Sequence, residues 1–114
     1  MEKYKLYWVG QGKVKTGKYI EAIKWWKEKA APGILADPWT ISLKCYAVQF
    51  GLGGDYVIEI WQEIGSYAAF DEMDKFWEEE SESTSKKLEI MKEGNEYFDW
   101  GPSRLMGDWP ESSY

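Results

Sequence analysis

The sequence contains no histidine and only one cysteine, Cys45, among 114 residues. Histidine is the commonest metal ligand and general base, so its absence excludes His-metal centres and Ser-His or Cys-His catalytic pairs. A lone cysteine forms no internal disulfide, which is typical of a reducing compartment. Cys45 lies in an apolar, strand-like run, which favours a buried, inert thiol over a nucleophile. Acid–base chemistry would therefore depend mainly on carboxylates, lysines or tyrosines.

Positive charge is also scarce, because 14 Lys and Arg face 20 Asp and Glu, giving a net charge of −6. The lysines are interleaved with glutamates, so no surface for tracking phosphates is predicted and nucleic acid is not an expected partner. The sequence has no P-loop, dinucleotide glycine fingerprint, zinc spacing or calcium loop. The acidic run 78–80 is interpreted as a solvated helix end. We therefore expect no metal and no cofactor.

Long apolar runs are missing as well. No window is long enough to span a bilayer, and the first residues, Met-Glu-Lys-Tyr-Lys, do not form the apolar core of a signal peptide. We therefore expect a cytoplasmic protein with no membrane partner.

Aromatic residues, in contrast, are abundant: eight Trp, eight Tyr and four Phe make up 18% of the chain. The length suits one domain with a single core. Periodicity and turn residues predict strands at 4–14, 41–51, 56–63 and 96–105, and helices at 18–31 and from Ser66, the second broken around 81–85. The glycines at 51–54 are interpreted as a hairpin turn. The sequence thus predicts an α+β domain over residues 1–105 and a C-terminal tail over 106–114.

The predicted order, βαββαβ, is ferredoxin-like: a four-stranded antiparallel sheet with two helices on one face. Alternation along 56–63 directs Tyr56, Ile58 and Ile60 toward the helices. The same alternation predicts an open face that carries Lys5, Tyr7, Val9, Gln11, Lys44, Tyr46, Val48, Phe50, Val57, Glu59, Trp61, Glu63, Tyr97 and Asp99. This face is too apolar to leave in water, so we expect a second copy of the chain to cover it and form a homodimer.

Two interpretations of the covered face remain open at this point. The sheets of two copies could enclose a cavity for an aromatic or hydrophobic ligand. Alternatively, the aromatic residues only fill a dimer interface, in which Lys44 pairs with Glu59 or Asp99.

Apolar stripes predict which side of each helix faces the core. The first helix carries Tyr19, Ile20, Ile23, Trp26 and Ala30, and the second carries Ala69, Phe70, Met73, Phe76 and Trp77. Trp26 and Trp77 are therefore expected to be core residues. Trp25 projects opposite the first stripe, where it contacts either the C-terminal Trp109-Pro110 segment or solvent.

The element order, the turn at 14–19 and the motif Glu59-Ile60-Trp61 followed by an Ala-Ala-Phe helix resemble the dimeric α+β barrel superfamily. This superfamily includes antibiotic-biosynthesis-type monooxygenases, heme-degrading monooxygenases and NIPSNAP-like proteins. The resemblance extends from Tyr4 to Leu105. It implies a homodimer in which two four-stranded sheets form one barrel, with a pocket between sheet and helices or inside the barrel.

The resemblance also implies site residues. Glu59 and Trp61 resemble the Glu-x-Trp pair of the family's third strand, whereas the missing axial histidine argues against heme degradation. A strand-one asparagine of some members is matched only by Gly10 or Gln11. The implied activity is cofactor-independent oxidation of a phenolic or quinol-like substrate, with Glu59 or Asp99 removing a proton. The ligand-binding residues would be Tyr7, Gln11, Lys44, Tyr46, Trp61 and Tyr97. The alternative is a noncatalytic dimerisation or protein-interaction module.

Overall fold

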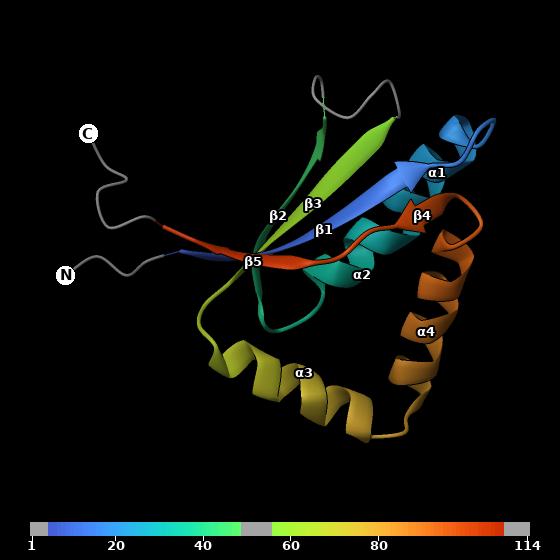
Figure 1. Cartoon of the computed structure of the whole chain (residues 1–114). Helices are drawn as coiled ribbons and strands as arrows, with labels where there is room; N and C mark the ends of the chain where they lie inside the picture. Colours follow the sequence, from blue (N-terminus) through green and yellow to red (C-terminus); the bar gives the residue numbers. More distant parts are fainter. Residues whose placement is uncertain (1–4, 49–55, 109–114) are drawn as a thin grey trace.

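A computed structural model of the chain describes residues 5–48 and 56–108. The strands are β1 (Leu6–Val14), β2 (Thr40–Ala47), β3 (Val57–Ile64), β4 (Phe98–Trp100) and β5 (Arg104–Gly107). The helices are α1 (Tyr19–Trp25), the π-helical η1 (Trp26–Ala30), α2 (Ala31–Leu35), α3 (Ala68–Glu78) and α4 (Glu82–Gly94) (Figure 1). The predicted hairpin turn at 51–54, Phe50 and Trp109-Pro110 lie outside the described residues.

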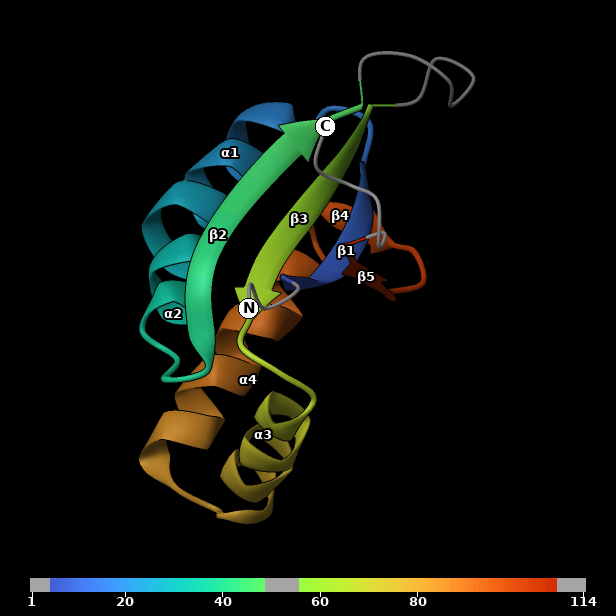
Figure 2. The ribbon, with the colours of Figure 1, turned by 90° about the vertical axis from the view of Figure 1, so that its left-hand side faces the viewer.

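The strands form one antiparallel sheet in the order β2-β3-β1-β4, with β5 also paired to β1. Figure 2 shows α1 and α2 running alongside β2 and β3, with α3 beyond one end of the strands. The predicted α+β, ferredoxin-like fold is thereby confirmed. No helix in the two described ranges has the length and apolar character needed to cross a membrane.

The last predicted strand is divided into two. In β4, Trp100 lies opposite Gly12, whereas in β5 Arg104 lies opposite Val9. The chain therefore advances four residues while β1 advances three, so the 101–103 segment contains one extra residue, as in a β-bulge. β5 continues to Gly107, past the predicted strand end at Leu105.

The break between α3 and α4 was predicted, and its cause is a capping box. The Ser81 side chain accepts a hydrogen bond from the Thr84 backbone N–H at 3.2 Å, and the Thr84 hydroxyl oxygen accepts one from the Ser81 N–H at 3.0 Å. These two bonds satisfy donors that a helix start leaves free. α4 therefore begins as a separate helix.

The predicted end of the first helix at residue 31, before Pro32-Gly33, is wrong, because α2 continues to Leu35. Pro32 falls in the first turn of α2, directly after the π-helical turn. The helix thus continues through Pro32, which has no N–H to donate, directly after a turn whose hydrogen bonds already have the wider π spacing.

The prediction that Trp25 projects away from the core is also wrong. Its side chain is 6% exposed and packs in a core cluster with Val14, Ile58 and Phe98. The reason is α4, which covers this side of α1: the Trp25 indole N–H donates to the Ile90 carbonyl oxygen at 3.0 Å. Three residues of the predicted stripe are instead exposed, namely Tyr19, Ile20 and Ile23.

A second cluster lies where α3 meets the end of the sheet, around Trp39, Ile64, Ala69 and Met73. Phe76 packs edge-on against Trp39, with ring centroids 5.7 Å apart. Trp77 contacts Phe76 but is 41% exposed, so its assignment to the core is wrong. Because α3 lies beyond the strands, the sheet covers only part of its apolar stripe.

Candidate functional site

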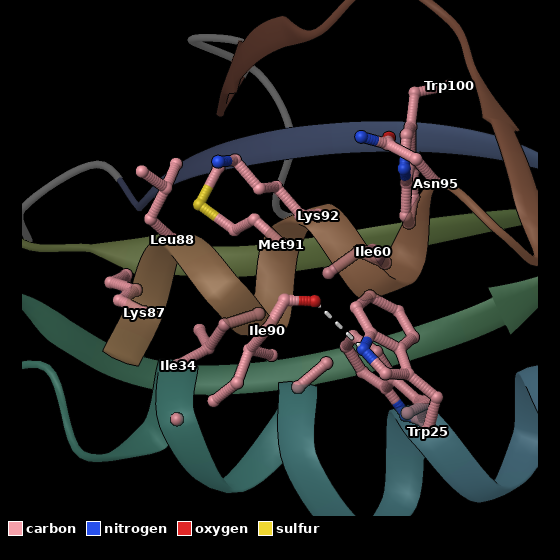
Figure 3. A pocket seen from close by; sticks show the side chains of 13 residues that line it. Trp25, Ile34, Ile60, Lys87, Leu88, Ile90, Met91, Lys92, Asn95 and Trp100 are labelled. Carbon is pink, nitrogen blue, oxygen red and sulfur yellow. Dashed lines mark hydrogen bonds between the residues drawn. The ribbon is translucent and has the colours of Figure 1, made fainter. Parts of the chain in front are cut away.

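A helix–sheet cavity of about 390 Å³ lies between the α1–α2 helical segment and α4 (Figure 3). Ile60 of β3 and Trp100 of β4 also line it. Its lining is largely apolar and aromatic, and consists of Trp25, Trp26, Ala30, Gly33, Ile34, Ile60, Lys87, Leu88, Ile90, Met91, Lys92, Asn95 and Trp100. The volume and composition fall in the range typical of small-molecule sites.

Polar contacts hold the two walls of this helix–sheet cavity together. Besides the Trp25–Ile90 hydrogen bond, the Lys29 ammonium group pairs with a Glu93 carboxylate oxygen at 2.5 Å, joining η1 to α4. The hydrogen bond from Lys29 lowers the pKa of Glu93. Near the middle of α4, Lys87 pairs with Asp37. These contacts fix the spacing between the helices without filling the space between them.

A second cavity of about 290 Å³ lies between α1 and the ends of β2 and β3, and Trp26 lines both cavities. At this second cavity, the Tyr56 hydroxyl donates to the Tyr19 hydroxyl at 3.4 Å, which raises the pKa of Tyr56. Burial raises the pKa of the Cys45 thiol to about 11. A thiol with a raised pKa is rarely ionised at neutral pH, which agrees with the interpretation of Cys45 as inert.

The open face of the sheet carries an aromatic cluster formed by Tyr7, Tyr46 and Trp61. Trp61 lies at its centre, with ring centroids 5.4 Å from Tyr7 and 6.0 Å from Tyr46. The Lys44 ammonium group lies 5.2 Å from the centroid of the Tyr46 ring, within cation–π range. Four of the predicted ligand-binding residues are thus neighbours, one from β1, two from β2 and one from β3.

Glu59 connects this aromatic cluster to β5. One of its carboxylate oxygens accepts a hydrogen bond from the Trp61 indole N–H at 3.1 Å, and the other accepts one from the Arg104 guanidinium group at 2.9 Å. The Glu59 side chain is 19% exposed. The interface interpretation paired Lys44 with Glu59 or Asp99, whereas Glu59 pairs with Arg104. No pattern in the sequence identified Arg104, because its face depends on the extra residue before β5.

The remaining predicted site residues lie apart from the aromatic cluster. Gln11 is opposite Glu59 in the β1–β3 register, so the two share the open face. Asp99 lies opposite Lys13 on the same face, but its side chain is 67% exposed, and the Lys15 ammonium group lies 4.0 Å from its carboxylate. A carboxylate that removes a proton near neutral pH needs a pKa raised by burial, and Asp99 is not buried.

The prediction that Tyr97 lies on the open face is wrong. Its ring packs 6.3 Å from that of Trp25, on the helix side, and its hydroxyl donates to Glu93 at 3.1 Å. The pKa of Tyr97 is raised, first by loss of hydration and then by this hydrogen bond. Tyr97 precedes β4 and is not bound by the alternation of the strand.

Comparisons with known proteins give structural matches only. No family model matches the sequence, and no curated protein is significantly similar to it. A NIPSNAP family protein from Agrobacterium tumefaciens superposes with a TM-score of 0.71 at 12% identity, covering 98% of this chain and 92% of that one. An antibiotic biosynthesis monooxygenase superposes with a TM-score of 0.57 at 13% identity, covering 90% of this chain and 95% of that one.

A third similar structure is a mutant of SnoaB from Streptomyces nogalater, a cofactor-independent oxygenase. Its TM-score is 0.59 at 10% identity, with 96% of this chain and 95% of that one covered. At such identities the likeness establishes the fold. This chain therefore has the α+β fold of the NIPSNAP and antibiotic-biosynthesis-monooxygenase structures, as the sequence resemblance indicated.

Proposed function

We propose that this protein binds a small hydrophobic or aromatic molecule in the helix–sheet cavity. The observation that carries the proposal is the cavity itself: about 390 Å³ lined by three tryptophans and several aliphatic side chains. Apolar contact with such a lining favours transfer of an apolar ligand from water, and indole rings add ring–ring contacts.

A cavity-filling variant tests this proposal. Gly33 lines the cavity, and a Cβ atom there would meet no heavy atom within 4 Å, so Gly33→Leu places apolar atoms in open space. We expect 2-naphthol, a neutral aromatic probe, to bind the wild type in calorimetric titrations and Gly33→Leu at least tenfold more weakly. Ala36→Leu, an exposed change just past α2, is the matched control and should bind normally. Equal binding by all three proteins would overturn the proposal.

We also propose that a second copy of the chain covers the open face to form a homodimer. The support is the aromatic cluster, in which Tyr46 remains 46% exposed, together with Met106 of β5 on the same face. Sedimentation should give a dimer. Trp61→Lys would introduce a charge at the centre of this face and should give a monomer, whereas Ile20→Lys, an exposed change on α1, should leave the dimer intact. A monomeric wild type contradicts the proposal.

Cofactor-independent oxygenase activity is a second candidate, favoured by the similarity to SnoaB. The geometry restricts it, since Glu59 lies on the open face while its neighbour Ile60 lines the cavity on the opposite face of the sheet. A substrate for Glu59 would therefore have to bind between the sheets of a dimer. Oxygen consumption with a dihydroxynaphthalene, lost in Glu59→Gln while the dimer persists, would support this activity. Rates equal to those without protein would leave the noncatalytic binding or dimerisation module as the alternative.

A further inference from the structure

We propose that the ligand of the helix–sheet cavity carries an anionic group beside its apolar body, and that Lys92 and Asn95 bind this group. The inference rests on the proposed binding function and specifies the class of ligand. It follows from the few polar groups that line the cavity.

The charged residues of the lining are two lysines, Lys87 and Lys92, and no Asp or Glu is among the described lining residues. This imbalance is notable in a chain with 20 acidic and 14 basic residues. The charge of Lys87 is already balanced by Asp37, and its ammonium group lies 5.9 Å from the Trp39 ring centroid. The Lys92 ammonium group has no hydrogen bond or ion pair among the residues that the structure describes.

Two of the nearby carboxylates are paired with other lysines. Glu93, the acidic neighbour of Lys92 in sequence, pairs with Lys29 and accepts a hydrogen bond from the Tyr97 hydroxyl group. Asp37 is paired with Lys87, and Glu96 lies outside the lining. A cationic ligand would consequently meet an unbalanced positive charge in this cavity, whereas an anionic group would neutralise it.

Lys92 and Asn95 are three residues apart at the C-terminal end of α4, so their side chains project from the same face of the helix. Figure 3 shows both, with Trp100, among the side chains around the cavity. The Asn95 side-chain amide supplies N–H donors. The indole rings of Trp26 and Trp100 each carry one N–H donor and no hydrogen-bond acceptor of their own. The lining thus offers donors and a positive charge, which together suit a carboxylate.

Paired probes test the inference. Calorimetry near pH 7 compares 2-naphthoate, an anion, with 2-naphthol, its neutral analogue of similar size. We expect wild type to bind 2-naphthoate more tightly than 2-naphthol, and Lys92→Gln to weaken 2-naphthoate binding about tenfold while 2-naphthol binding is unchanged. Lys86→Gln removes the same charge from α4 outside the lining and is the control.

Each result bears on the inference. A loss of 2-naphthoate affinity, but not of 2-naphthol affinity, in Lys92→Gln supports it. High salt should then weaken the binding of 2-naphthoate more than that of 2-naphthol. If naphthol binds as tightly as naphthoate, or if Lys92→Gln and Lys86→Gln behave alike, the inference is overturned although the binding function stands. If neither probe binds wild type, both the inference and the proposed function fail.

Discussion

The contact between Gly94 and Trp25 gives the sharpest test of how α4 packs on α1. A Cβ atom at Gly94 would lie 2.5 Å from Cζ2 and 2.7 Å from Cη2 of the Trp25 ring. Real Cβ atoms do not approach other atoms so closely, so one of the two must move. Trp25 is 6% exposed and its indole N–H is held by the Ile90 carbonyl group, so the ring has little room to shift.

The magnitude follows from two opposing effects of Gly94→Ala. Forcing an extra methyl group into a packed core costs about 1–3 kcal/mol. Alanine in place of glycine within a helix stabilises it by up to about 1 kcal/mol, and by less at the last residue of α4. We therefore expect Gly94→Ala to lower the free energy of unfolding by about 1–2 kcal/mol, or the Tm by about 4 °C for each kcal/mol.

Urea unfolding measured by circular dichroism checks this prediction. Gly33→Ala is the matched control, because a Cβ at Gly33 meets nothing within 4 Å and the change should stabilise the protein by about 0.5–1 kcal/mol. The two glycine-to-alanine changes thus have opposite expected signs. A Gly94→Ala protein as stable as wild type, with an unchanged urea dependence, would refute the packing of Trp25 against α4.

Three further predictions concern single side chains. Gly12→Ala places a Cβ 2.7 Å from the Trp100 ring, but Trp100 is 39% exposed and can move, so thermal unfolding should show a smaller loss than for Gly94→Ala. Burial raises the pKa of the Cys45 thiol from 9.0 to about 11, so the stabilisation from the protonated thiol is present below pH 9 and lost as pH rises toward 11. Iodoacetamide should therefore modify the thiol slowly in the folded protein at pH 9 and rapidly in the urea-unfolded protein. Because Lys29 lowers the pKa of Glu93 below 4.5, the contribution of Glu93 is present above pH 4.5 and lost in more acidic solution, so Glu93→Gln should flatten the fall of Tm below that pH, and an unchanged profile would contradict the ion pair.

The strands and the order of elements were predictable because alternation and turn residues report local conformation. In β3, the separation of Ile58 and Ile60 from Glu59 and Trp61 was correct, and it placed Trp61 beside Tyr7 and Tyr46. Cross-strand register follows once the faces are assigned. The open face could therefore be predicted nearly residue by residue, except near the last two strands, where Tyr97 lies on the helix side and Arg104 pairs with Glu59.

Contacts between helices were not predictable from periodicity. The burial of Trp25 depends on α4, 65 residues away along the chain at Ile90, and on the missing side chain of Gly94. Periodicity did not predict the helix–sheet cavity for the same reason, since its walls come from separate helices; only the family resemblance implied a pocket between sheet and helices, as one of two places. The one available signal was Trp25 itself, a large aromatic residue with no place in the predicted stripe.

The extra residue between β4 and β5 makes the composition of both faces sensitive to chain length. With continuous pairing, Arg104 would lie opposite Trp8 on the helix side; the added residue instead places it opposite Val9, on the same face as Glu59. Deleting one residue from 101–103 would remove the extra residue and keep Arg104 opposite Val9. Inserting one residue there, with the single bulge kept, would instead place Arg104 opposite Trp8, directing Arg104 inward and Leu105 outward. Substitutions and a single deletion in this segment should therefore be tolerated more readily than an insertion, because an insertion would carry the Arg104 charge to the helix side of the sheet.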